Sequence, residues 1–321
     1  MNLVAVDIGG THARFAMAEI KDRRVIALGE PTTFKTAEHA SFQNAWEAFG
    51  QLAGPLPRAV AIAIAGPITG EAIRLTNNPW IIRPAEVGAR LGVDAWRLVN
   101  DFEAVGHAVA TASADDFIHL TGPDAPLPPE GIITVIGPGT GLGVAWVQRN
   151  RGRYHVQATE GGHIEYAPLD AVEDAIVARL RARYRRVSAE RVVSGPGLVA
   201  IHETLAAGER RGIAPRDDKT LWAAGMDGSD GLAAAAVERF CLSLGSVAGY
   251  IAIAQGADAV VIAGGLGLRI KDVLIRSGFA ERFRAKGRFE ELMARIPVKL
   301  IIHPQPGLFG AAAAFAQEHT A

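Results

Sequence analysis

The chain has 321 residues, of which 49% are hydrophobic and 21% charged, and its formal net charge is −1. A chain of this length exceeds the size at which a single hydrophobic core stops growing, so we expect two lobes. The balanced charge gives no basic excess of the kind that nucleic-acid-binding proteins carry, which argues against a nucleic-acid partner.

The single cysteine, Cys241, excludes an internal disulfide and a multi-cysteine zinc site. It lies in an apolar run, which favours a buried small side chain over a nucleophile. The chain begins with a strand-like run and shows neither the basic region nor the cleavage site of a signal peptide. No stretch approaches the roughly 18 uninterrupted apolar residues of a membrane span. We therefore expect a cytoplasmic protein with no membrane partner.

The first third of the chain alternates short apolar runs with glycine turns, which predicts a β-rich beginning. The first two runs are joined by a Gly9-Gly10 turn, a hairpin signal. Residues 42–52 carry apolar side chains at helical spacing on one face, namely Phe42, Trp46 and Phe49. The predicted strands are residues 3–6, 12–20, 25–28, 58–65 and 97–99, and the predicted helices are 42–52, 84–91 (with proline in its first turn) and 104–112.

Residues 121–131 hold four prolines, which predicts a surface loop and a lobe boundary. Beyond this loop, Gly245 and Gly249 would let a long helix pack closely against a neighbour. The arginines between 179 and 186 would suit a phosphate, but a helical register spreads them around the axis and favours a solvated face. The predicted strands are residues 132–136, 144–148, 259–263 and 298–302; the predicted helices are 169–184, 198–205, 232–255, one after 267 that ends near 277, and 310–318; residues 206–219 are predicted as a loop.

Asn100 and Asp101 place an amide and a carboxylate at the end of the predicted strand 97–99. In open α/β sheets, ligands bind at the ends of strands. A carboxylate there is a candidate general base, and the neighbouring amide could orient a hydroxyl. The alternative is a helix cap, because Asn and Asp are preferred caps. Taken alone, the dipeptide favours the cap.

Glycine turns near residues 9, 139 and 264 each follow an apolar strand. Glycine lets backbone N–H groups approach an anion closely, and Thr11 and Thr140 add hydroxyl donors. Tight hairpins also need glycine, so each turn alone favours a structural interpretation. No lysine follows as in a P-loop, and a strand instead of a helix follows residues 137–143, unlike a dinucleotide fingerprint. A P-loop enzyme and a Rossmann dehydrogenase are therefore not supported.

The same pattern occurs in both halves of the chain. Aligning Thr11 with Thr140 gives strand, glycine–threonine turn and strand in each half. The match is short, but it predicts a structural repeat whose two turns do the same job.

Taken in order, the three turns resemble the actin-like ATPase fold of sugar kinases. The segment Asp7-Ile-Gly-Gly-Thr resembles its first phosphate loop, residues 137–143 its second, and residues 260–267 its adenosine loop. Asn100-Asp101, Glu160-Gly-Gly-His163 and residues 188–197 narrow the resemblance to the bacterial glucokinase family, over nearly the whole chain. It implies an α/β, two-lobed actin-like ATPase (ribonuclease H-like) fold with duplicated β-sheet cores and an interlobe cleft. The implied small lobe is residues 1–109 plus 304–321, and the large lobe is 110–303.

The resemblance implies ATP-dependent phosphorylation of D-glucose at the 6-hydroxyl, a reaction of glycolysis, with Asp101 as general base. A hexose presents only hydroxyls, so its site needs carboxylates and amides that accept and donate in pairs. Singly, Glu160 fits a solvated loop acid, His163 a structural histidine and Glu190 a helix-face charge; together they fit a sugar. The implied substrate-binding residues are Asn100, Asp101, Glu160, His163 and Glu190, and the implied ATP-binding residues are Val6, Asp7, Ile8, Gly9, Gly10, Thr11, Gly139, Thr140, Gly141, Gly264 and Gly265.

No all-protein metal cage is visible in the sequence. Mg²⁺ would be carried by the ATP phosphates, with Asp7 as a contact through water. The related ROK sugar kinases carry a cysteine-rich zinc motif after their sugar-binding histidine, whereas no cysteine cluster follows His163 here. We therefore expect a kinase of the non-ROK type without structural zinc. The resemblance also implies a homodimer.

Three other functions are left open by the residues. The first is a kinase for another hexose, such as mannose or an N-acetylhexosamine. The second is a sugar-responsive transcription regulator. It is disfavoured because such a regulator needs an N-terminal helix-turn-helix, whereas the first predicted strand begins at Leu3, and because the balanced charge argues against DNA binding. The third is a non-catalytic scaffold, which leaves the sugar-type cluster unexplained. Asn77 and Asn78 could line a sugar site, but a turn before Pro79 explains them equally well.

Overall fold

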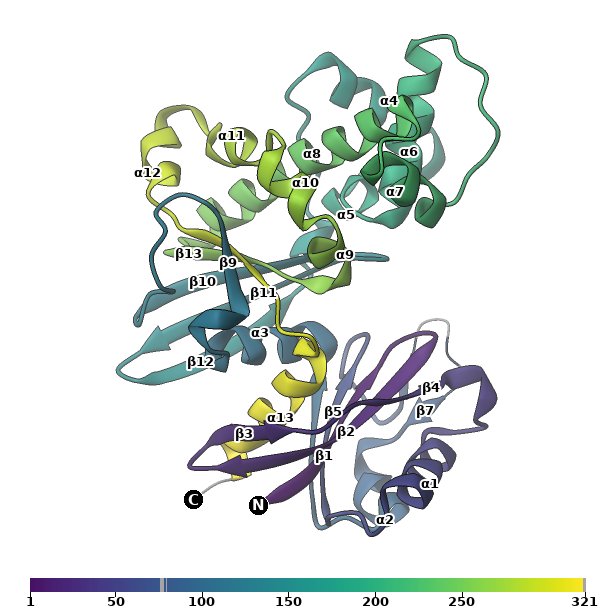
Figure 1. Cartoon of the computed structure of the whole chain (residues 1–321), viewed down its shortest axis with the longest axis vertical. Coiled ribbons are helices and arrows are strands. Elements are labelled where there is room, and N and C mark those ends of the chain that lie inside the picture. The colour runs from purple at the N-terminus through teal and green to yellow at the C-terminus, as the bar shows by residue number, and fades with distance from the viewer. Residues whose placement is uncertain (76–77, 79, 320–321) are drawn as a thin grey trace. The chain divides into compact units, whose positions relative to one another are not determined.

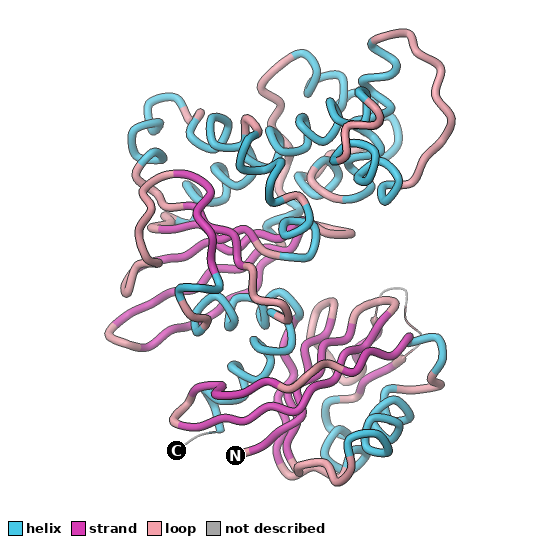
Figure 2. The backbone as a smooth tube through the Cα atoms, viewed as in Figure 1, coloured by secondary structure: helices cyan, strands magenta, loops and turns pink. Residues whose placement is uncertain are grey.

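The computed structural model describes residues 1–75, 78 and 80–319. The chain divides into two compact units: the first comprises residues 1–113, 156–158 and 303 onwards, and the second comprises 114–155 and 159–302. Each unit is built on a β-sheet with helices packed against it (Figures 1 and 2). The predicted α/β class is confirmed. The proline-rich residues 121–131 lie within the second unit and do not mark the boundary.

The first unit contains a mixed sheet with the strand order β3-β2-β1-β5-β8, and β4 also pairs with β2. Strands β1, β5 and β8 run parallel, whereas β2 is antiparallel to β1, β3 and β4. Strand β5 is buried along its whole length, as expected of a parallel strand covered on both faces. The strands are β1 (Asn2–Ile8), β2 (His12–Lys21), β3 (Arg24–Leu28), β4 (Thr32–Lys35), β5 (Ala59–Ile64) and β8 (Ala95–Asn100), and β6 (Ile73–Arg74) pairs separately with β7 (Ile81–Ile82).

Alternation along β5 separates two cores on the two faces of this sheet. Its branched residues join the aromatic face of α1, formed by Phe42, Trp46 and Phe49 as predicted. Its alanines join the alanine-rich helix α13, which lies along the other face (Figure 1). Small side chains on both surfaces allow the helix to approach the sheet closely. The helices are α1 (Phe42–Ala53), α2 (Val87–Leu91), α3 (Asp101–Thr111) and α13 (Pro306–His319).

The second unit repeats the arrangement of the first. Its sheet has the order β12-β11-β10-β13-β14-β9. Strand β10 pairs antiparallel with β11 and parallel with β13, as β1 does with β2 and β5. The predicted structural repeat is therefore confirmed. The strands are β9 (Phe117–Thr121), β10 (Gly131–Pro138), β11 (Leu142–Asn150), β12 (Arg153–Thr159), β13 (Ala259–Ile262) and β14 (Val298–Ile301).

Helices of the second unit gather mainly on one side of its sheet, around the long helix α8 (Figure 2). Helix α8 is long and apolar enough to cross a membrane, but 72% of its most apolar window is buried, as in a core helix. Its Gly245 and Gly249 lie against the backbone of α11, and a Cβ would stand 2.4 and 2.5 Å from carbonyl oxygens there. The helices are α4 (Ala171–Tyr184), α5 (Ala189–Val192), α6 (Gly195–Gly208), α7 (Asp218–Met226), α8 (Gly231–Gln255), α9 (Gly264–Arg269), α10 (Lys271–Arg276), α11 (Phe279–Arg284) and α12 (Glu290–Ala294).

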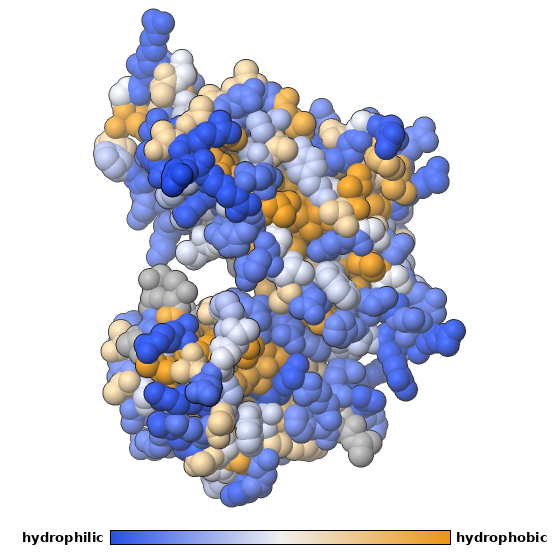
Figure 3. Space-filling view, turned by 180° about the vertical axis from the view of Figure 1, so that it is seen from behind, coloured by the Kyte–Doolittle hydropathy of each residue, from blue (hydrophilic) through white to orange (hydrophobic). Residues whose placement is uncertain are grey.

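Charged and polar side chains cover most of the face shown in Figure 3, with apolar residues between them. Exposed large apolar residues such as Leu52, Ile275 and Leu292 come from separate elements, and scattered apolar residues are normal on a protein surface. Cys241 is fully buried, as predicted. The arginines between 179 and 186 are not merely solvated, because Arg179 and Arg183 both contact Glu203 of α6 at 2.8 and 2.7 Å.

Some predicted elements differ from the structure. Strands β4, β9 and β12 were not expected, because they are short or mix polar and apolar residues without a clear period. Residues 84–91 begin as a 3₁₀ turn before α2, and the predicted loop 206–219 overlaps α6 and α7 at its ends. Helix α3 begins at Asp101, earlier than the predicted residue 104.

Candidate functional site

Parallel strands β1, β5 and β8 end at the same edge of the first sheet, and polar side chains occupy that edge. Asp7 pairs in register with Ala63 of β5, which in turn pairs with Val99. Asp7 is thus the last polar residue of β1, while Asn100 closes β8 and Asp101 opens α3. The structure therefore brings Asp7, Asn100 and Asp101 to one edge.

Asn100, and not Asp101, is the cap of α3. Its Oδ1 accepts hydrogen bonds from the N–H groups of Phe102 at 2.9 Å and Glu103 at 3.1 Å, and its Nδ2 donates to the carbonyl of Gly66 at 3.0 Å. Asp101 is the first helical residue, and its Oδ1 accepts from the Phe102 N–H at 2.9 Å. The cap interpretation thus applies to Asn100, and the Phe102 N–H helps to hold the Asp101 carboxylate in place.

The surroundings of Asp101 favour its protonated form. Burial, reinforced by the nearby charge of Asp7, raises the pKa of the Asp101 carboxyl to about 6, although hydrogen bonds from the backbone and from Asn100 oppose the rise. Burial also raises the pKa of Asp7, whose cross-strand partner Arg14 lies 3.3 Å away and lowers it in part. A carboxylate with a pKa near 6 suits general-base work at neutral pH.

Two polar side chains hold the carbonyl groups of the first glycine turn. Thr36 donates through its Oγ1 to the Gly10 carbonyl at 3.1 Å and through its N–H to the Thr11 carbonyl at 3.0 Å. Asn78 donates to the Gly9 carbonyl at 3.2 Å. Within the residues that the structure describes, the N–H groups of Gly10 and Thr11 have no hydrogen-bond acceptor. Paired free N–H groups of this kind suit an anion.

Sequence reasoning missed Thr36 and assigned Asn78 differently. Asn78 accepts the Trp80 N–H through its Oδ1 at 2.9 Å, and its Nδ2 supports the first glycine turn. Asn77 and Pro79 lie outside the described residues. No local signal could have found Thr36, because its contact with the turn depends on the pairing of β4 with β2.

The second glycine turn, Gly139 to Gly141, is held by two different groups of its own unit. The Gly195 N–H at the start of α6 donates to the Gly139 carbonyl at 2.8 Å. Glu190 accepts the Leu142 N–H through its Oε2 at 3.0 Å. As in the first turn, the next two N–H groups, those of Thr140 and Gly141, have no acceptor among the described residues.

Three predicted sugar-binding residues gather around the end of this turn. Gly162, inside the Glu160–His163 motif, lies so close to Leu142 that a Cβ would stand 2.3 Å from its carbonyl oxygen. Glu190 contacts the N–H of the same residue. Glu160 and His163 are exposed, and their Oε2 and Nε2 atoms lie 3.6 Å apart. The backbone bridge between Glu165 and Ser188 joins the two segments.

The third glycine turn, Gly264 and Gly265, lies beside the second. It follows β13, which is parallel to β10. Gly264 has φ +84, and a Cβ there would stand 3.1 Å from the Pro138 carbonyl oxygen. Gly265 has nothing within 4 Å of its Cβ position. The structure thus places both turns at one edge of the second sheet.

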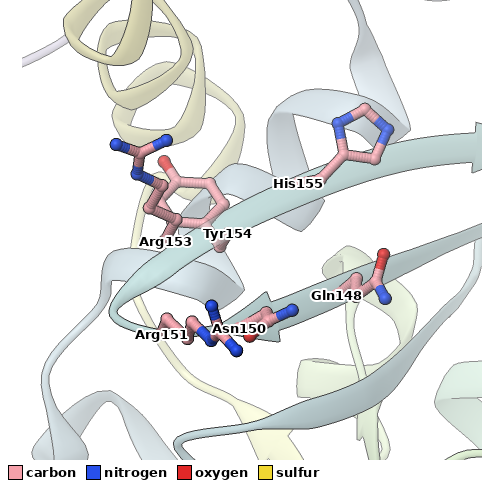
Figure 4. Close-up of a pocket in the computed structure, with 6 residues that line it drawn as sticks. All are labelled: Gln148, Asn150, Arg151, Arg153, Tyr154 and His155. Carbon is pink, nitrogen blue, oxygen red and sulfur yellow. The ribbon is translucent and has the colours of Figure 1, made fainter.

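Two pockets help to delimit the candidate site. An open pocket at the β11–β12 hairpin, lined by residues between Gln148 and His155, contains none of the predicted site residues (Figure 4). A smaller pocket is lined by both Thr140 and Glu190. Among the described residues, no group of three or more His, Cys, Asp or Glu side chains could hold a metal ion.

These features define an α/β protein with mixed sheets, and the same fold occurs in solved sugar kinases. A glucokinase from an Antarctic psychrotroph is similar with a TM-score of 0.87 and 30% identity, over 99% of both chains. A ROK family glucokinase from Streptomyces griseus shares the fold, with a TM-score of 0.64 and 19% identity over 99% of this chain and 100% of that one.

Sequence comparison identifies the family. The family model described as Glucokinase matches residues 3–318. The glucokinase of Zymomonas mobilis is 59% identical over 321 residues, which cover 100% of this chain and 99% of that protein. The glucokinase of Caulobacter vibrioides is 39% identical over 97% of this chain and 94% of its own. The chain therefore belongs to the glucokinase family and is an enzyme.

Proposed function

We propose that this enzyme transfers the γ-phosphoryl group of ATP to the 6-hydroxyl of D-glucose. The observation that carries the proposal is Asp101, a carboxylate held at a strand end with a pKa raised to about 6. Asp101 takes the proton of the 6-hydroxyl as that oxygen forms a bond to the γ-phosphorus and the bond to ADP breaks. Positioning and electrostatics supply most of the catalysis in phosphoryl transfer, so a base of moderate strength is sufficient.

Hexose binding is assigned to Asn100, Asp101, Glu160, His163 and Glu190. Carboxylates accept hydrogen bonds from sugar hydroxyls, and the imidazole and amide groups add donors. In support, the Oε2 atom of Glu160 lies 3.6 Å from the Nε2 atom of His163. Glu190 accepts the N–H of Leu142, and Gly162 of the same motif packs against Leu142. The Asn100 amide caps the helix through its Oδ1 and donates one N–H to the Gly66 carbonyl, which leaves its second N–H for a sugar hydroxyl.

ATP binding is assigned to the three glycine turns. The N–H groups of Gly10, Thr11, Thr140 and Gly141, which have no acceptor among the described residues, suit phosphate oxygens. The residues fit Mg²⁺ carried by the nucleotide, because one half-buried carboxylate, Asp7, lies beside the first turn. When bound, Mg²⁺ would neutralise phosphate charge. The proposed set is Val6, Asp7, Ile8, Gly9, Gly10, Thr11, Gly139, Thr140, Gly141, Gly264 and Gly265.

The same proposal includes the finer features that the resemblance implies. The fold would be the two-lobed actin-like ATPase fold, which the shared strand order of the two sheets supports. The lobes would be residues 1–109 plus 304–321 and residues 110–303. The single, buried Cys241 supports the non-ROK type. A homodimer in the cytoplasm completes the proposal.

The decisive experiment measures ADP release by a coupled assay, with ATP and magnesium, across a panel of hexoses. Glucose should give the highest kcat/KM, and Asp101→Ala should lower kcat at least about 100-fold. Asn100→Ala is the matched control for the helix cap: it should lower stability by roughly 1 kcal/mol. Near-normal turnover by Asp101→Ala would refute the catalytic role. Higher kcat/KM with mannose or an N-acetylhexosamine would favour the alternative substrate.

A further inference from the structure

Glu190 contacts the second glycine turn as well as belonging to the proposed sugar-binding set. Its Oε2 accepts the N–H of Leu142, the residue that follows the turn, at 3.0 Å. Its Oε1 accepts no hydrogen bond from the part of the chain that the structure describes. The carboxylate is half-buried, and it lines the same small pocket as Thr140. One oxygen is thus committed to the turn and the other is left for a ligand.

Gly141 shows how closely the turn and this carboxylate fit together. A Cβ at Gly141 would stand 2.5 Å from Oε2 and 3.2 Å from Cδ of Glu190. Gly141 does not have a positive φ, so an alanine there would not strain the backbone but would force the carboxylate to shift. Any movement of the Gly141 backbone towards Glu190 must therefore displace the carboxylate, and the reverse also holds.

Residues on either side of Glu190 strengthen this connection. Five residues further on, Gly195 donates its N–H to the Gly139 carbonyl at 2.8 Å. The segment from 190 to 195 therefore contacts both ends of the turn. Before it, Ala189 donates to the Ile164 carbonyl at 2.8 Å, next to His163. The segment joins the proposed sugar-binding motif to the proposed phosphate-binding turn by hydrogen bonds within one unit.

We propose that Glu190 is a positioning residue that couples sugar binding to the conformation of the second glycine turn. A glucose hydroxyl on Oε1 would fix the carboxylate, and Oε2 would then fix the Leu142 N–H and with it the N–H groups of Thr140 and Gly141. Coupling of this kind is reciprocal, so the nucleotide should strengthen glucose binding by the same factor. The inference rests on the proposed function, because it takes glucose and ATP as the two ligands.

The test uses the same substitution at two positions of one turn. Gly141→Ala pushes a methyl group against Glu190, whereas the Cβ position of Gly139 has nothing within 4 Å. Glucose binding is measured by calorimetry without any nucleotide. Gly141→Ala should raise the glucose Kd about tenfold, since it misaligns a hydrogen bond to a charged acceptor. Gly139→Ala should keep the Kd of the parent protein.

The second measurement is the Kd of the non-hydrolysable analogue AMPPNP with magnesium, with and without saturating glucose. In the parent protein glucose should tighten AMPPNP binding, and in Glu190→Ala this effect should disappear. Glu190→Gln keeps an oxygen that can accept the Leu142 N–H, so glucose should still tighten AMPPNP binding in part. Thermal melting identifies any variant that fails to fold. If Gly141→Ala does not fold, the Glu190 variants alone decide whether glucose and nucleotide binding are coupled.

Each result points in one direction. Failure of the parent protein to bind glucose would refute the proposed function. If the parent binds glucose and Gly141→Ala binds it equally well, the coupling is wrong while the function stands. An equal loss of glucose affinity in Gly139→Ala would also overturn the coupling, because the effect would then come from the turn as a whole and not from Glu190.

Discussion

Replacing Asp101 with asparagine should make the protein more stable at neutral pH while removing most of its activity. Burial and the charge of Asp7 raise the pKa of the Asp101 carboxyl from 3.8 to about 6. The folded state therefore holds this proton more tightly than the unfolded state, and stability falls as the pH rises between these two values. At about 1.4 kcal/mol per pKa unit, ionised Asp101 lowers the free energy of unfolding by up to about 3 kcal/mol.

Urea unfolding at a series of pH values measures this effect. Asp101→Asn should exceed the parent protein by up to about 3 kcal/mol above pH 6, and the two should converge below about pH 4, where Asp101 becomes protonated in the unfolded state as well. Glu71→Gln, which neutralises an exposed carboxylate of the same unit, is the control and should differ little from the parent at any pH. The kcat of Asp101→Asn should fall at least about 100-fold.

Two outcomes would refute this reasoning. If Asp101→Asn were no more stable than the parent at pH 8, the carboxylate would not be the destabilised group that its surroundings imply. If its extra stability persisted at pH 4, the gain would come from packing or hydrogen bonding and not from charge. If Asp101→Asn gains stability and loses activity, the Asp101 carboxylate serves catalysis at the expense of stability.

Three further predictions concern other parts of the molecule. Asp7→Asn removes the charge that helps to raise the pKa of Asp101, so the acid limb of kcat/KM against pH should move to lower pH; an unmoved limb would contradict the coupling. Gly162→Ala places a methyl group 2.3 Å from the Leu142 carbonyl oxygen, and scanning fluorimetry should show a loss of about 2 kcal/mol or more. Burial raises the pKa of the Cys241 thiol to about 12, so a thiol reagent should react only after unfolding; fast labelling of the native protein would contradict this.

Most of the fold could be predicted because its central elements have strong local patterns. Strand β5 is a continuous buried run and α1 carries a single aromatic face, so composition and period were sufficient. Strands such as β4 and β12 owe their conformation to pairing with a neighbouring strand. Such pairing produces no clear sequence pattern in strands of four to seven residues.

The candidate site was predictable in its residue types but not in its connections. The Asn100-Asp101 pair was open to two interpretations, a helix cap and a general base. In the structure the Asn100 amide caps the helix, and the Asp101 carboxyl has a raised pKa. The convergence of Gly162 and Glu190 on Leu142 involves backbone atoms from distant segments. A contact between a side chain and a distant backbone N–H cannot be predicted from the pattern of side chains in the sequence.

The two glycine turns explain why the internal repeat is clear in the structure and faint in the sequence. Both turns present two successive N–H groups without acceptors among the described residues, and both follow a strand that pairs antiparallel with the next strand and parallel with a later one. Their supports differ, since Thr36 and Asn78 hold the first turn, whereas the backbone of Gly195 and the side chain of Glu190 hold the second. An anion requires only the free N–H groups. Each turn could therefore acquire its own supports, and only the second has one that is also a proposed sugar ligand.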